Sequence, residues 1–264
     1  MILNYIVWNI NPEIFHIGFL SIRWYGMLFA AAFLFGFMIF QKFFKKENVP
    51  AELLDSLLIY MMVGTVAGAR LGHCFFYDFD YYIANPFEIL MVWKGGLASH
   101  GAAIGILIAM WLWSRKFKRD FFWLMDRIVI VGALSGLFIR TGNLMNSEIY
   151  GIETSLPWGF IFIRDNQTLP KHPTQIYEAL SYTAIFGMLI YFYFKNILIN
   201  NKGKIFGLFL ILLFITRFLI EFIKNPQSEF ENGLAINMGQ ILSLPFIAIG
   251  FYFFFRKTKP APTV

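Results

Sequence analysis

Residues 205–224 read IFGLFLILLFITRFLIEFIK, an apolar run that carries Arg217 and Glu221. A helix of about 20 such residues is long enough to cross the hydrocarbon core of a bilayer. Further runs of similar length lie at 22–41, 55–77, 97–114, 121–139, 174–194 and 237–255. The sequence therefore predicts an all-α integral membrane protein with about seven transmembrane helices.

The composition supports this class. Of the 264 residues, 58% are hydrophobic and 14% are charged, and 33 are phenylalanine. A soluble domain carries roughly a quarter charged residues, so the excess apolar surface is expected to face lipid. The net charge is +6, but the charges form short clusters between the apolar runs, and we therefore expect membrane lipid and no nucleic acid as a partner.

Basic residues gather in every second connection and so predict an orientation. The clusters are Lys42, Lys45 and Lys46; Arg115, Lys116, Lys118 and Arg119; Lys195, Lys202 and Lys204; and Arg256, Lys257 and Lys259. The connections between them are acidic or mixed. Because basic loops stay in the cytoplasm, we expect the N-terminus outside and the C-terminus inside.

We expect a single polytopic membrane domain over 1–256 and a disordered cytoplasmic tail over 257–264. The longest connection, 141–171, holds several Gly and Pro residues and is expected to form a small extracytoplasmic cap with a short strand near 158–163. Small residues four apart predict close helix packing. They are Gly64, Gly68 and Gly72; Gly101 and Gly105; and Gly132 and Gly136.

Several spans also carry ionisable side chains, and each of these costs about 2.5–3.5 kcal/mol or more at mid-membrane depth. The predicted topology brings most of them to the outer side. These are Arg70, His100, Arg140, Glu178, Arg217 and Glu221, with Tyr25 and His172 at similar depth. Asp126 and Arg127 lie near the cytoplasmic end, where we expect a structural role.

Arg140 and Arg217 suit a phosphate, because a guanidinium group presents a planar fork of donors and keeps its charge. At this depth the phosphate would belong to a lipid headgroup, and His100 could act as a general base. Neither a Gly-x-Ser-x-Gly motif nor a His-Glu-x-x-His zinc motif is present. The residues therefore favour transfer between two bound substrates. The alternatives are an intrahelical Arg217–Glu221 ion pair, a transporter or channel, and a non-catalytic lipid-binding protein.

The run RTGNLMNSEIYG at 140–151 resembles the hallmark loop of bacterial prolipoprotein diacylglyceryl transferases. Further stretches agree with that family in order and spacing. They are Trp24-Tyr25-Gly26, Ser99-His100-Gly101, HPTQIYE at 172–178, RFLIEF at 217–222 and MGQILS at 238–243. The chain departs from the family pattern at Ala102, Ile139, Ile152, Lys171 and Lys224.

The resemblance implies transfer of a diacylglyceryl group from phosphatidylglycerol to the lipobox cysteine of a prolipoprotein signal peptide. The product is a thioether, glycerol phosphate is released, and the enzyme lies in the bacterial cytoplasmic (inner) membrane. We expect no metal and no cofactor. The expected catalytic residues are Tyr25, His100, Arg140 and Arg217. The expected substrate-binding residues are Arg70, Arg140, Asn143, Asn146, Glu148, Gly151, His172, Gln175, Tyr177, Glu178 and Glu221.

Overall fold

The computed structural model describes residues 5–18, 20–199, 201–225 and 236–257. The chain forms two compact units, which are described separately below. Unit 1 comprises Met1–Gly36 and Met125–Val264, and unit 2 comprises Phe37–Leu124. The expected tail at 257–264 lies outside the described residues from 258 onward.

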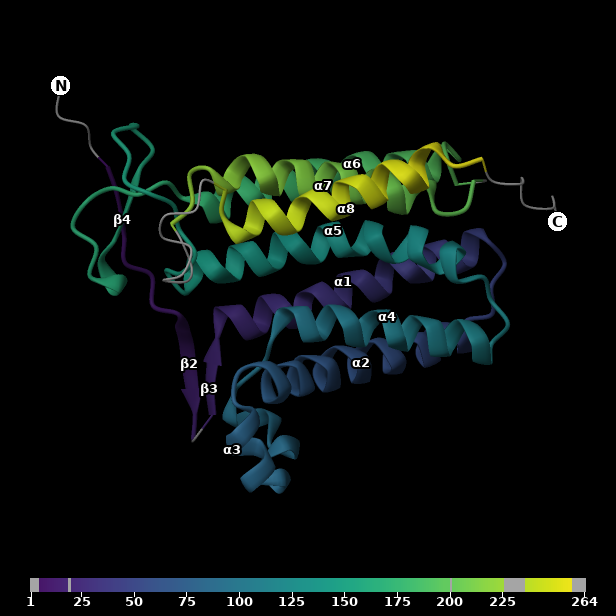
Figure 1. The fold of residues 1–264 in the computed structure, drawn as a ribbon, viewed down its shortest axis with the longest axis horizontal. Coiled ribbons are helices and arrows are strands. Elements are labelled where there is room, and N and C mark those ends of the chain that lie inside the picture. Colours follow the sequence, from purple (N-terminus) through teal and green to yellow (C-terminus); the bar gives the residue numbers. More distant parts are fainter. Residues whose placement is uncertain (1–4, 19, 200, 226–235, 258–264) are drawn as a thin grey trace. The chain divides into compact units, whose positions relative to one another are not determined.

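Each predicted span falls on one long helix (Figure 1). The helices are α1 (Trp24–Lys46), α2 (Glu52–Phe76), α4 (Ser99–Lys116), α5 (Phe121–Met145), α6 (Thr174–Phe194), α7 (Lys204–Glu221) and α8 (Met238–Phe255). Within the described residues, five helices are long and apolar enough to cross a membrane, namely α1, α2, α5, α6 and α8. The protein is therefore a mostly helical integral membrane protein.

The two remaining long helices have charged residues near both ends or polar residues at their start. Each has 18 residues, and α7 includes Lys204, Arg217 and Glu221. α4 begins with Ser99 and His100 and ends with Arg115 and Lys116. α7 is otherwise strongly apolar, whereas α4 is polar at both of its ends.

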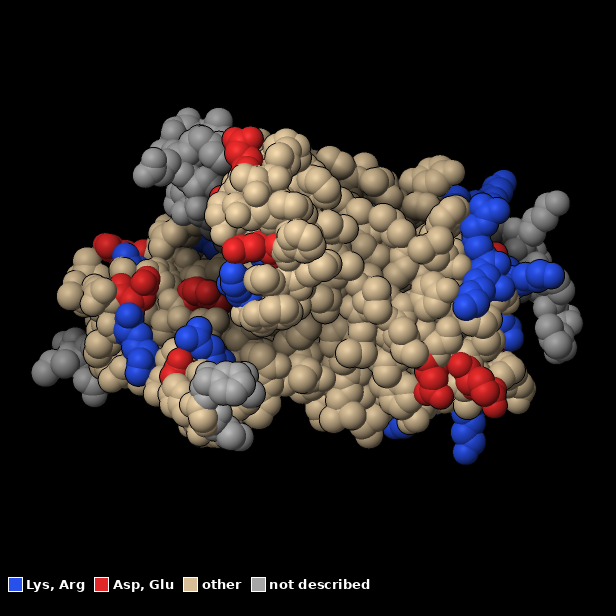
Figure 2. Space-filling model, turned by 90° about the horizontal axis from the view of Figure 1, so that it is seen from below, with Lys and Arg blue, Asp and Glu red and all other residues tan. Residues whose placement is uncertain are grey.

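The surface of the helices has the character expected in lipid. On the face shown in Figure 2, charged side chains gather at the ends of the helices and the stretch between them carries none. Large apolar side chains are exposed along the helices, among them Leu34, Ile59, Val63, Leu180 and Leu219. In water such a surface would be unfavourable, whereas in a bilayer it faces a solvent of matching polarity.

In unit 2, α2 and α4 pack through their glycines. A Cβ atom on Gly68 would lie 2.4 Å from the Gly101 carbonyl oxygen, and one on Gly105 would lie 2.1 Å from the Gly64 oxygen. The backbones approach this closely only because neither position has a side chain. The predicted packing role of these glycines is confirmed. The connection after α2 holds α3 (Phe79–Ala84), η1 (Pro86–Leu90) and η2 (Val92–Lys94), which the sequence analysis did not predict.

In unit 1, α7 packs between α6 and α8, and the three run side by side (Figure 1). Gly207 and Gly250 let α7 and α8 approach closely, since a Cβ atom on Gly207 would lie 2.7 Å from the Phe254 nitrogen and 2.8 Å from the Gly250 oxygen. α8 begins with a capping box, in which Asn237 accepts from the Gln240 backbone and Gln240 accepts from the Asn237 backbone. This reciprocal cap fixes where the last helix starts.

Short strands accompany the helices of unit 1. β1 (Ile6–Trp8) pairs in parallel with β4 (Phe160–Phe162), and β2 (Glu13–Ile17) pairs in antiparallel with β3 (Leu20–Arg23). The strand predicted near 158–163 is thus present as β4, followed by η3 (Ile163–Asp165).

Asp126 has the structural role that its position predicted. Its carboxylate is fully buried and accepts hydrogen bonds from the backbone N–H groups of Gly203 and Phe206, at 2.7 and 2.8 Å. These groups belong to the first turn of α7, whose N–H donors have no partner inside the helix. Asp126 therefore caps α7 from α5.

Candidate active site

Helix α5 ends later than predicted. The sequence predicts a span that ends at residue 139 and a connection that begins at 141, but the helix continues to Met145. Gly142 indicated a loop, yet it serves a close contact, because a Cβ atom there would lie 2.7 Å from Cδ2 of the Tyr25 ring. Arg140 and Asn143 therefore lie one helical turn apart on α5, and Arg140 Nη1 donates to Asn143 Oδ1 at 3.1 Å.

A buried group of charges lies beside this turn. Glu178 of α6 has no exposed side-chain surface, and its two oxygens face two cations. Arg140 Nε lies 2.8 Å from Oε2, and Lys224 Nζ lies 3.0 Å from Oε1. Lys224 Nζ also lies 3.7 Å from Glu221 Oε2. We call Arg140, Glu178, Lys224 and Glu221 the charge network.

Glu148 is fixed at the end of α5 by amide side chains. Its Oε1 accepts from Asn143 Nδ2 at 2.8 Å and from Asn146 Nδ2 at 3.2 Å. Its backbone oxygen accepts from the buried Gln175 Nε2 at 2.7 Å. The predicted residues Asn143, Asn146, Glu148 and Gln175 therefore do lie together.

The backbone beside Glu148 is strained. Ile149 has a φ of +60°, a left-handed conformation that a β-branched residue rarely adopts. The Thr174 hydroxyl donates to the Ile149 oxygen at 2.9 Å and helps to hold it. Such strain costs about 1–3 kcal/mol and persists only where surrounding contacts determine the conformation.

Gly151 ties this segment to the end of α7. Its N–H donates to the His172 oxygen at 2.8 Å, and the Asn225 side chain donates to its oxygen at 3.1 Å. It forms an antiparallel bridge with Lys224. A Cβ atom on Gly151 would lie only 2.2 Å from the Ile223 oxygen, so the position is restricted by close backbone packing.

Arg217 and Glu221 do not form the intrahelical ion pair that the sequence left open as an alternative. Among the described residues, no hydrogen bond or ion pair involves the Arg217 guanidinium, and its Nε is shielded from solvent. Glu221 instead faces Lys224 and lies against α8, where a Cβ atom on Gly239 would be 2.4 Å from its carboxyl carbon. A simple intrahelical Arg217–Glu221 pair is therefore not what the described residues form.

His172 and Tyr177 lie at the start of α6, on the side of the connection. His172 Nδ1 is 3.2 Å from the Tyr177 hydroxyl, which also accepts from Trp158 Nε1 at 3.0 Å. Partial burial lowers the pKa of His172 below its ordinary value, which favours the neutral ring. Among the described residues, no hydrogen bond or ion pair joins either side chain to the charge network.

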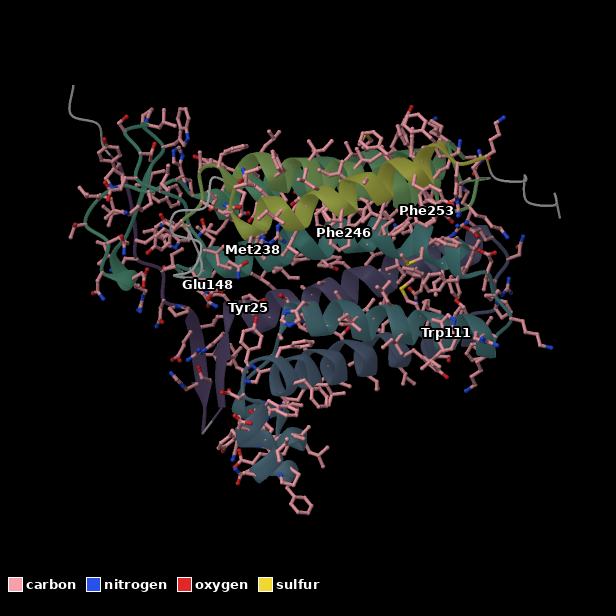
Figure 3. All side chains as sticks on the ribbon, in the orientation of Figure 1. Tyr25, Trp111, Glu148, Met238, Phe246 and Phe253 are labelled. Atoms are coloured by element: carbon pink, nitrogen blue, oxygen red, sulfur yellow. The ribbon has the colours of Figure 1, made fainter. Side chains whose placement is uncertain are left out.

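Figure 3 shows at which end of the unit 1 helices the site lies. Tyr25, Glu148 and Met238 lie at the same end of the unit 1 helices, whereas Phe246 and Phe253 follow α8 towards the other end. The polar contacts above thus gather where α5 ends and α6 and α8 begin.

In unit 2, Arg70 is occupied by backbone carbonyls. The side chain is 2% exposed, and it donates to the oxygens of Glu88, Ile89, Gly95 and Gly96 at 2.6 to 3.3 Å. Arg70 was expected to bind substrate, and in the structure these bonds fasten the 86–96 connection to α2.

His100 lies in the first turn of α4. Its ring centroid is 5.5 Å from that of Phe76 and 5.7 Å from that of Tyr77. Aromatic neighbours at this distance restrict how the imidazole can turn.

Lys224 is the site residue that the sequence analysis missed. It was noted only as a departure from the family pattern. The available signal was its spacing, because residues three apart such as Glu221 and Lys224 share a helix face.

A model of the family described as prolipoprotein diacylglyceryl transferase matches residues 12–256. The chain belongs to this family.

Relatives of the prolipoprotein diacylglyceryl transferase family match nearly the whole chain. A protein of Tolumonas auensis is 47% identical over 253 residues, which cover 96% of this chain and 97% of the relative. One of Chloroherpeton thalassium is 45% identical over 259 residues, covering 98% and 96%. One of Porphyromonas gingivalis is 43% identical over 270 residues, covering 97% and 95%. Each is named phosphatidylglycerol–prolipoprotein diacylglyceryl transferase.

Proposed function

We propose that the chain transfers the diacylglyceryl group of phosphatidylglycerol to the lipobox cysteine of a prolipoprotein signal peptide. The relatives carry the name of this activity over nearly their full length. The observation that carries the proposal is the environment of the two arginines. Arg140 is held by Glu178 and Asn143, and Arg217 has no bond to another described residue.

Arg140 and Arg217 bind the phosphate in this proposal. The contacts with Glu178, Asn143 and Tyr182 leave N–H donors of Arg140 that can still receive an anion. Donors fixed in advance stabilise charge as it develops on a leaving group, and this is worth most where water is excluded. The leaving glycerol phosphate gains such a charge.

The reaction forms one bond and breaks one. A cysteine thiol has a pKa near ~8.5 and must lose its proton to become a good nucleophile. The thiolate forms a C–S bond with the glycerol carbon as the C–O bond to phosphate breaks, and glycerol phosphate leaves with the electron pair. His100 is the proposed base, on the basis of the Ser99-His100-Gly101 motif. If His100→Gln kept its turnover and its pH dependence, another group would have to take the proton.

The other predicted residues have supporting roles in the proposal. Tyr25 and Asn143 give neutral hydrogen bonds to the glycerol or the phosphate. Asn146, Glu148 and Gly151 shape the segment above them, and His172, Gln175, Tyr177 and Glu178 place it against α6. Glu221 faces Lys224 and places a negative charge one helical turn from Arg217. No metal or organic cofactor takes part, because the phosphodiester already provides a leaving group, and activity should be unchanged by EDTA.

The proposed topology puts this site on the outer side of the bacterial inner membrane. It counts seven spans in one domain over 1–256, and includes α4 and α7 among them. The N-terminus is outside, the C-terminus is cytoplasmic and 141–171 forms an extracytoplasmic cap. The basic connections at 42–46 and 115–119 support this orientation.

The proposal is tested with the purified protein in detergent. The reaction contains phosphatidylglycerol and a peptide that ends in a lipobox cysteine, and mass spectrometry follows the peptide. We expect the mass of one diacylglyceryl group to be added to the cysteine, and none when that cysteine is replaced by serine. A folded protein that binds phosphatidylglycerol but adds nothing would instead be a lipid-binding protein.

A further inference from the structure

Lys224 is the least expected member of the charge network. Its side chain is 2% exposed, and its Nζ lies between the carboxylates of Glu178 and Glu221, at 3.0 and 3.7 Å. A lysine this deeply buried is retained only when it is paired, because a buried charge without a partner is very unfavourable. Lys224 and Arg140 are related through a shared partner, Glu178.

The connection between them is Glu178. One oxygen of this buried carboxylate faces Arg140 Nε and the other faces Lys224 Nζ, so the carboxylate is shared between two cations. The four groups of the charge network balance, with two positive and two negative charges. Without Lys224, two buried carboxylates would remain beside a single arginine.

The charge of that arginine matters in the proposed function, on which this inference rests. A phosphate is attracted only if the carboxylates around Arg140 do not outweigh its charge, and buried charges are poorly screened by salt. We propose that Lys224 is a positioning residue for the transfer reaction. It neutralises Glu178 from the side opposite Arg140, so that the guanidinium stays oriented by Glu178 and still attracts the phosphate.

The backbone supports the same role. Residue 224 is fixed by its bridge to Gly151, next to the Ile152 N–H that donates to the Ile223 oxygen at 2.9 Å. The segment that carries Glu148 and the segment that carries Lys224 are therefore held to each other. These backbone contacts fix the position of Lys224.

The test compares variants that remove the positive charge of Lys224 with one that keeps it. Lys224→Met keeps most of the unbranched side chain and removes its charge, and Lys224→Arg keeps the charge. The double variant Glu178→Gln, Lys224→Met removes the carboxylate together with the lysine. Lys171→Met is the matched control, because Lys171 pairs with the exposed Glu153 at 3.0 Å, outside the charge network.

KM for phosphatidylglycerol and kcat are measured separately, with the thermal midpoint in detergent as a measure of folding. We expect Lys224→Met to raise KM about tenfold or more, equivalent to about 1.4 kcal/mol of lost binding. The KM of Lys224→Arg should stay within about threefold of wild type. The KM of the double variant should be at least about threefold lower than that of Lys224→Met. The control should match wild type.

Three results would overturn the inference: a normal KM in Lys224→Met, equal losses in Lys224→Arg and Lys224→Met, or a folded double variant that recovers nothing. If Lys224→Met does not fold, Lys224→Gln, which also removes the charge, takes its place in the same comparison. Binding of phosphatidylglycerol vesicles is measured in parallel. Absence of transfer by wild type would count against the proposed function. Weaker vesicle binding by Lys224→Met than by Lys171→Met would still support the role of Lys224 in attracting the phosphate.

Discussion

Replacing Gly151 with alanine tests how the segment after α5 is held. The new Cβ atom would lie 2.2 Å from the Ile223 oxygen, and ordinary contacts begin at 3.4 Å, so one segment must move by about 1.2 Å (3.4 − 2.2). Two further atoms, His172 Cβ and Thr174 Cγ2, lie at 2.8 Å and prevent an escape in their direction. Overpacking of this kind costs about 1–3 kcal/mol.

The expected loss of activity is larger than the loss of stability. A ~1 Å displacement of groups that position a substrate can cost on the order of 10²-fold in rate. Gly151→Ala should therefore lower kcat/KM by roughly that factor and lower the thermal midpoint by roughly 2–12 °C. Both are measured in detergent, by the peptide transfer reaction and by loss of the monodisperse protein on heating.

Gly187 of α6 provides the control, because a Cβ atom there would meet nothing within 4 Å. Gly187→Ala should keep its activity and be neutral or more stable, since alanine favours a helix over glycine by about 1 kcal/mol. If Gly151→Ala behaved like Gly187→Ala, the close approach of Gly151 to Ile223 would not be what positions this segment.

Other substitutions test separate contacts. Arg217→Lys keeps the charge and removes the fork, and we expect a severe loss of transfer with normal folding; full activity would show that a point charge is enough. Arg70→Met leaves the carbonyls of the 86–96 connection without their donors, and we expect faster hydrogen exchange there than in Lys94→Met, which removes only an exposed pair with Glu88. Equal exchange in the two variants would contradict the fastening role. Asp126→Asn weakens two charge-assisted bonds to the first turn of α7, and we expect a lower thermal midpoint with an unchanged KM. A changed KM with an unchanged midpoint would remove Asp126 from its structural role.

The long helices could be predicted from the sequence because apolar length determines them. α6 occupies the predicted 174–194, and α8 starts within a residue of the predicted 237. The largest error in unit 1 was the end of α5, where Gly142 indicated a loop. Glycine has two uses, to break a helix and to let a neighbour approach, and only the position of the Tyr25 ring distinguishes them.

The short strands were mostly beyond sequence reasoning. β4 was predicted, but β1 was not, because a three-residue strand depends on the partner that it finds. β2 and β3 lie in a region that lacks the length of a span and has no strong turn dipeptide.

The candidate site could be predicted as a group of residues, but not as a set of pairs. The motifs correctly brought Asn143, Glu148 and Gln175 together. Sequence spacing left an Arg217–Glu221 pair open as an alternative, whereas Glu221 faces Lys224, which lies just beyond the end of α7. The spacing of Arg70 also could not reveal that four backbone carbonyls occupy its guanidinium.

The most direct test of the account is transfer by Arg140→Ala and Arg217→Ala beside wild type. Each variant is mixed with phosphatidylglycerol and the lipobox peptide, and the released glycerol phosphate is measured together with the added peptide mass. The account predicts equal amounts of both products from wild type and almost none from either variant, although both variants remain folded. Near-normal transfer by either folded variant would contradict the claim that two arginines hold the phosphate that leaves.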